Sequence, residues 1–171
     1  MKYRLLLMCL CAAALPTMAT ALDPAALSDA EKQMIARSCR DAQRAMQRLE
    51  TIDPISRVNR GNGYSNVAKL MTAMSSRAAY NSYSIPQFAA ATNAVQSLRQ
   101  QFSDHYTDYE IALQDVVEMD CSTKPQSFYR ALVDVRAKRA VVNDDVSKLD
   151  AQLDIFSRAM IELQTLIEAN P

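Results

Sequence analysis

A long heptad repeat near the C-terminus constrains this chain more than any other feature. Apolar side chains recur every three or four residues from Phe128 to Ile167, and eleven of the twelve stripe positions are apolar. The stripe consists of Phe128, Leu132, Val135, Arg139, Val142, Val146, Leu149, Leu153, Phe156, Met160, Leu163 and Ile167. A spacing near 3.5 residues held over this length is typical of a long helix that packs as in a coiled coil.

A second repeat predicts another long helix, from Ser84-Ile85-Pro86 to about residue 120. Its stripe contains Phe88, Ala91, Val95, Leu98, Phe102, His105, Tyr109, Ala112, Val116 and Met119. At 1.5 Å per residue, this helix and the C-terminal one would be about 54 and 66 Å long. The links at 83–85 and 121–124 are short, so we expect neighbouring helices to run antiparallel.

The first arm, residues 28–82, completes the predicted fold. Ser28 and Glu31 match a capping box, which starts a helix, and Asp53 before Pro54 would cap a restart of that helix. We expect a break near Pro54 or Gly61, because proline and glycine both disfavour helix interiors. The predicted fold is all-α: an elongated antiparallel three-helix, coiled-coil-like bundle with a broken first arm. A first arm folded back at the break would instead give a four-helix bundle.

The N-terminus has the pattern of a secretory signal peptide. Lys2 and Arg4 precede an apolar run, and Ala19-Thr20-Ala21 follows it as a cleavage site. We therefore expect a signal peptide at 1–21 and a single helical domain at 22–171, secreted to the periplasm or the extracellular space. The apolar run is too short to span a membrane, and we expect no transmembrane anchor in the mature form.

Cys39 and Cys121 are the cysteines that remain after this cleavage. An even number of cysteines in an oxidising compartment indicates a disulfide. The bond would close a loop of roughly 80 residues and contribute about 4 kcal/mol on the chain-entropy model. Two buried free thiols and a link between two chains are the alternatives.

One segment resembles a known group of proteins. Cys121 to Val146 is similar to a stretch of small, uncharacterised, predicted-secreted helical proteins of minimal-genome bacteria. The shared positions are Cys121, Pro125, Phe128, Tyr129, Leu132, Arg136, Arg139, Val142 and Val146. The resemblance implies a helical fold and export, and it implies no activity.

Polar residues within the stripes predict a polar layer in the core. Arg139 would lie opposite about residue 107 in an antiparallel hairpin, and we expect it to pair with Asp108 or Glu110. A buried arginine needs such a partner, and the pair can fix the register of packing. The predicted layer comprises His105, Asp108, Tyr109, Glu110, Arg136 and Arg139. Two roles fit such a layer: fixing the register of helix packing, and binding a small ligand.

Charge is unevenly distributed although the formal net charge is zero. Arg37, Arg40, Arg44 and Arg48 would form a basic strip on the outer face of the first helix, whereas residues 104–120 hold six acids and no lysine or arginine. The basic strip is either a solvated face or a docking site for an anionic partner. Balanced total charge argues against nucleic acid as the partner.

Catalytic and metal-binding patterns are absent from the sequence. His105 is the one histidine, so paired acid–base catalysis and transition-metal sites lack their usual ligands. We predict no catalytic residue, metal or cofactor. The predicted function is an exported, non-enzymatic interaction, scaffold or chaperone-like protein, with an anionic envelope component, a protein or a second copy as partner. A bundle that binds a small ligand at the polar layer is the alternative.

Overall fold

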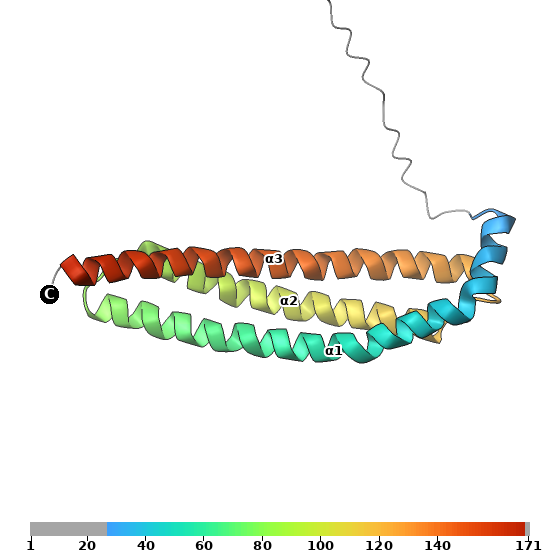
Figure 1. The fold of residues 1–171 in the computed structure, drawn as a ribbon, viewed down its shortest axis with the longest axis horizontal. Coiled ribbons are helices and arrows are strands. Elements are labelled where there is room, and N and C mark those ends of the chain that lie inside the picture. The colour runs from blue at the N-terminus through green and yellow to red at the C-terminus, as the bar shows by residue number, and fades with distance from the viewer. Residues whose placement is uncertain (1–26, 170–171) are drawn as a thin grey trace, which may run out of the picture.

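The computed structural model describes residues 27–169, and these form three long helices. They are α1 (Asp29–Tyr80), α2 (Pro86–Glu118) and α3 (Pro125–Ala169). The three helices extend side by side along one long axis (Figure 1). The predicted all-α fold with three helices is confirmed. The predicted signal peptide lies outside the described residues, and no helix within 27–169 is apolar over a length that would cross a bilayer.

Local sequence explains where each helix begins. At the start of α1, Ser28 Oγ accepts from the backbone N–H of Glu31, and the Glu31 carboxylate accepts from the backbone N–H of Ser28. This is the predicted capping box. Helices α2 and α3 begin at Pro86 and Pro125. Proline suits a first helical position because its missing N–H would have no partner there.

Helix α1 is continuous, which corrects the predicted break in the first arm. Pro54 and the segment 61–63 are helical, and Asp53 caps no restart because it is buried inside the helix. Proline in a helix interior removes one backbone hydrogen bond and bends the helix, and each glycine costs about 1 kcal/mol. Packing against α2 and α3 offsets these costs. Figure 1 shows α1 bent in its blue N-terminal part.

Contacts between helices follow a regular order along the bundle. Arg57 on α1 pairs with Glu110 on α2, and further along α1 Ser75 lies 3.2 Å from Thr92. Helix α1 residue numbers therefore rise as those of α2 fall. The same opposed order relates α2 to α3, where His105 contacts Asp145 and Phe88 stacks near Phe156. This order brings the middle of all three helices together.

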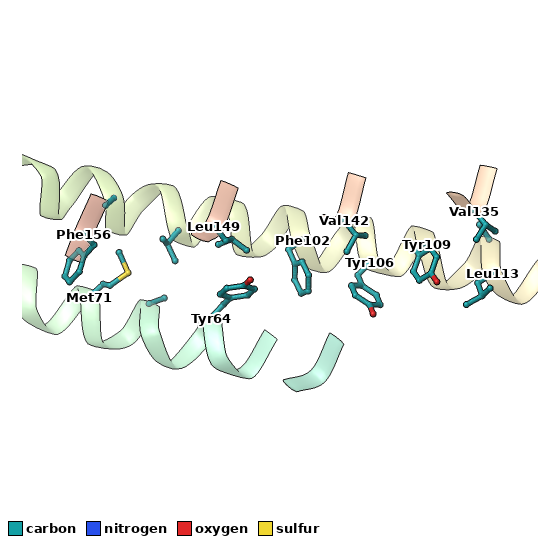
Figure 2. Packing of buried hydrophobic residues seen from close by; sticks show 14 of the residues in the cluster. Tyr64, Met71, Phe102, Tyr106, Tyr109, Leu113, Val135, Val142, Leu149 and Phe156 are labelled. Atoms are coloured by element: carbon teal, nitrogen blue, oxygen red, sulfur yellow. The ribbon is translucent and has the colours of Figure 1, made fainter. Parts of the chain in front are cut away.

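Aromatic side chains form the centre of the core. Tyr64, Phe102, Tyr106 and Tyr109 form a row in which each ring contacts the next edge to face, with centroids 5.5–5.7 Å apart. Figure 2 shows them in the space between the helices, facing aliphatic residues of α3 such as Val142. Such pairs stabilise by about 0.5–1.5 kcal/mol beyond the area they bury.

The predicted stripes describe most of this core. Tyr106 and Leu113 are buried although they lie beside the predicted α2 stripe, because α2 packs against α1 as well as α3 and buries a wider face. Ile167 ends the predicted α3 stripe but is 47% exposed. Near its C-terminus α3 therefore lacks the partner that its sequence predicts.

The N-terminal part of α1 is attached to the α2–α3 loop. Cys39 and Cys121 are buried with their sulfur atoms at bonding distance and their Cα atoms 5.4 Å apart. Gln43 Nε2 donates to the carbonyl oxygen of Met119 at 3.1 Å. The predicted disulfide pair is therefore placed correctly, and it fixes the bent end of α1.

Candidate functional site

A buried carboxylate, Asp53, organises the polar layer of the bundle. Tyr109 Oη donates to Asp53 Oδ2 at 2.5 Å, and Tyr106 Oη donates to the backbone carbonyl of Asp53 at 2.7 Å. Arg139 Nη2 on α3 lies 3.5 Å from the same Oδ2 atom. Side chains from α2 and α3 thus converge on one residue of α1, beside Pro54.

The two tyrosines of this layer are held in their neutral form. Burial, with Asp53 and Glu110 nearby, raises the pKa of Tyr106 to about 12. Burial and the hydrogen bond to Asp53 also raise the pKa of Tyr109. Both hydroxyls therefore remain hydrogen-bond donors at physiological pH and are poor proton acceptors for catalysis.

A second ion pair lies on the α1–α2 side of the layer. Arg57 Nη1 is 2.5 Å from Glu110 Oε2, and its Nη2 donates to Thr107 Oγ1 at 2.9 Å. The Arg57 guanidinium also lies over the Tyr106 ring, 5.9 Å from its centroid. No pattern in the sequence indicates this pair, because Arg57 interrupts no apolar repeat.

A third polar contact joins α2 to α3. His105 Nδ1 lies 2.6 Å from Asp145 Oδ2, and the Asp145 side chain is 2% exposed whereas that of His105 is 40% exposed. Asp145 directly precedes Val146 of the predicted stripe, and an acidic residue beside a stripe ordinarily faces water. Its burial could not be predicted without a partner on α2.

The predicted polar layer is therefore real in part, but its pairing is different. His105, Tyr109, Glu110 and Arg139 all make polar contacts between helices. The expectation that Arg139 pairs with Asp108 or Glu110 is wrong, because α1 supplies Asp53 to Arg139 and Arg57 to Glu110. Asp108 and Arg136 are exposed and lie outside the layer. The predicted pairs come from counting residues along α2 and α3 alone, and this count leaves out α1, which supplies both partners.

A small hollow adjoins the layer, but its size disfavours a ligand site there. Its volume is about 140 Å³, and Asp53, Arg60, Arg139 and Asn143 are among its lining residues. Pockets that bind small molecules are usually about 300–1,000 Å³. A polar hollow of this size holds a few water molecules.

The predicted basic strip is fully on the surface. Arg37, Arg40, Arg44 and Arg48 are all exposed, and the one ion pair that the strip makes within residues 27–169 is Arg44 with Asp41, at 3.7 Å. The first three of these arginines line a hollow of about 590 Å³ between α1 and the α2–α3 loop. The strip is thus concave where it meets the loop.

On the loop side of this hollow lies an acidic residue, Asp120, whose carboxylate is hydrogen-bonded within the loop. Asp120 accepts hydrogen bonds from the backbone N–H and hydroxyl groups of Ser122 and Thr123. These bonds lower the pKa of Asp120 to about 2. Asp120 therefore stays ionised at physiological pH, but within residues 27–169 it makes no ion pair with an arginine of the strip.

No family model, no curated protein and no solved structure matches this chain. Residues 27–169 contain no group of three or more histidine, cysteine, aspartate or glutamate side chains arranged to hold a metal ion. Geometry and charge are therefore the grounds on which a function can be proposed.

Proposed function

We propose that this protein is an exported, non-enzymatic interaction or scaffold protein that docks an anionic partner on the basic strip. It would act in the periplasm or the extracellular space as an antiparallel three-helix bundle. The opposed order of the contacts between α1, α2 and α3 supports that arrangement. A signal-peptide pattern and a buried cysteine pair support export.

The observation that carries this proposal is an exposed row of four arginines, three of which line a hollow, with one ion pair to the row among the described residues. Arginine binds carboxylate and phosphate groups with two parallel hydrogen bonds, which gives geometry as well as charge. The disulfide pair and Gln43 fix this part of α1 against the loop, so the arginines are presented on a rigid support.

The partner is a protein or an envelope polymer with a regular row of negative charge. A second copy of the chain also offers such a row. Asp104, Asp108, Asp115 and Glu118 lie at spacings of three, four or seven residues on the outer face of α2 and are all exposed. Among the described residues, none of these carboxylates has a lysine or arginine within ion-pair distance.

The proposal is tested by replacing three arginines of the strip. A variant with Arg37→Gln, Arg40→Gln and Arg44→Gln is compared with the unaltered protein on immobilised polyglutamate, heparin and isolated envelope polymer under a salt gradient. We expect the variant to elute at lower salt, because each lost arginine contact removes one salt-sensitive interaction. Light scattering at low and high salt measures self-association in the same samples.

A matched control separates the strip from total charge. Arg77→Gln, Arg136→Gln and Arg158→Gln remove the same number of exposed arginines from elsewhere on the bundle. The control variant should keep most of the affinity. If the two triple variants elute together, the strip is a solvated face and the proposal is wrong.

A further inference from the structure

A second and separate hollow lies between α1 and α2. Its volume is about 390 Å³, and its walls come from residues 57–65 of α1 and residues 99–103 of α2. Gly61 is part of its lining, and a Cβ atom at this position would meet no atom within 4 Å. The glycine therefore leaves open space in the wall. The volume falls within the range of small-molecule sites.

Arg99 lines this hollow, and one of its N–H donors lacks an acceptor in the part of the chain that the structure describes. Within residues 27–169, Arg99 Nε is the one buried side-chain nitrogen or oxygen atom without a hydrogen-bond partner. Arg99 Nη1 makes a long contact of 3.4 Å with Ser65 Oγ, and no carboxylate of the described residues lies within ion-pair distance of Arg99. An arginine remains charged and has five N–H donors, and a buried donor without an acceptor is costly.

The remaining lining is rich in donors and contains no acidic residue. Ser65, Ser103 and Asn62 contribute hydroxyl and amide groups. Two carboxylates of α2 contact residues that line the hollow: Glu110 pairs with Arg57, and Asp104 accepts from Gln100 Nε2 at 2.9 Å. The hollow thus offers hydrogen-bond donors and positive charge to an incoming acceptor.

The adjoining hollow continues the same chemistry along the groove. Its volume is about 440 Å³, it shares Ser65 and Arg99 with the first, and it adds Lys69, Thr72 and Gln96. Again no aspartate or glutamate is among the lining residues. A ligand held at Arg99 could therefore extend in this direction without meeting negative charge.

We propose that the groove between α1 and α2 binds an oxyanion, a phosphate or sulfate group carried by a small molecule, with Arg99 as its principal ligand. Phosphate and sulfate oxygens match the planar donor arrangement of a guanidinium group. Arg99 and Ser65 line both hollows. This site is distinct from the basic strip, whose hollow shares no lining residue with it.

Calorimetric titration of the purified protein tests this site. Inorganic phosphate, sulfate and glycerol phosphate are titrated at fixed ionic strength, with chloride as the reference anion. We expect saturable binding that chloride does not reproduce. Arg99→Gln should weaken it by about tenfold or more, since charge-assisted hydrogen bonds are stronger than neutral ones. Arg158→Gln removes an exposed arginine outside the groove and should leave binding unchanged.

A second variant keeps the test decisive if Arg99→Gln fails to fold. Gly61→Leu places a side chain at the open wall, improves helix propensity and leaves Arg99 in place. It should abolish phosphate binding without loss of stability. Phosphate heats equal to those of chloride, or binding that survives both variants, would overturn the proposal. Binding to anionic phospholipid vesicles but not to glycerol phosphate would overturn the assignment to a small molecule.

Discussion

The side chain of Asp53 joins α1 to both other helices in the middle of the bundle. Its carboxylate has lost most of its contact with water and is compensated by the hydroxyl of Tyr109 and, at longer range, the guanidinium of Arg139. A hydrogen bond to a charged group contributes about 1.5–3 kcal/mol. The contribution of Arg139 is smaller because its side chain is 48% exposed.

We expect Asp53→Ala to lower the free energy of unfolding by about 1–3 kcal/mol, because Tyr109 loses its acceptor within the core. Urea denaturation followed by circular dichroism measures this change. Asp108→Ala is the matched control, since Asp108 is exposed on α2 and should stay within about 0.5 kcal/mol of the unaltered protein. Equal effects of the two substitutions would contradict a central role for Asp53.

Alkaline pH should destabilise the protein through Tyr106. Burial raises the pKa of Tyr106 to about 12, above the value of about 10 in an unfolded chain. The neutral phenol therefore stabilises the fold fully below about pH 10, and this contribution is lost as the pH rises towards 12. Tyr106→Phe should reduce the fall in unfolding free energy over this range.

Unfolding free energies measured at several alkaline pH values test this expectation. Tyr80→Phe is the control, because Tyr80 is 89% exposed. An unchanged pH dependence in Tyr106→Phe would show that other groups cause the alkaline loss of stability.

A sequence pattern can show that a residue faces the core, but it seldom shows which residue of another helix it contacts there. Arg139 interrupts a stripe and so signals a polar contact, but nothing local indicates that Asp53 is its partner. A carboxylate before proline matches a helix cap equally well. Asp145 is the same kind of case, because only the packing of α2 against α3 places His105 beside it.

At the scale of the helices, the first residue of each helix and the face that it buries follow from sequence. Whether a helix continues through a proline or a glycine depends on its packing against other helices. Capping and first-position proline predict where each helix begins. The break in α1 is predicted from Pro54 and Gly61, yet tertiary contacts keep the helix continuous. Intrinsic propensities are about 1 kcal/mol for glycine and 3 for proline, and packing against two helices exceeds them.

The end of α1 shows a backbone strain that can be relieved. Ser82 has a φ of 63°, the left-handed conformation, while its N–H and that of Tyr83 bond back to the carbonyls of Ala79 and Ala78. This geometry is a Schellman-type helix end, where glycine is usual. Ser82→Gly should therefore raise the free energy of unfolding by about 0.5–1 kcal/mol.

Chemical denaturation of Ser82→Gly and Ser84→Gly tests the conformational explanation. Ser84 does not have a positive φ, so glycine there should not stabilise. A gain at both positions, or at neither, would contradict a specific release of strain at Ser82.

At the scale of the whole molecule, the cysteine pair limits how far the chain can open. It joins residues 82 apart in sequence, and a loop of this length predicts stabilisation by about 4 kcal/mol on the chain-entropy model. Cys39→Ser with Cys121→Ser should lower the unfolding free energy accordingly. Reductant should shift the melting temperature of the unaltered protein but not that of the double variant. A reductant-insensitive melting curve for the unaltered protein would contradict the link.

The position of that link also orders events during chain growth. Cys39 emerges early, and its partner follows only when α2 is complete. A covalent ring formed at that point would enclose most of α1 and all of α2 before α3 is added. If oxidation comes at this point, assembly of the bundle would divide into a closing step and a docking step, and an earlier oxidant would find Cys39 alone and could join it to another molecule.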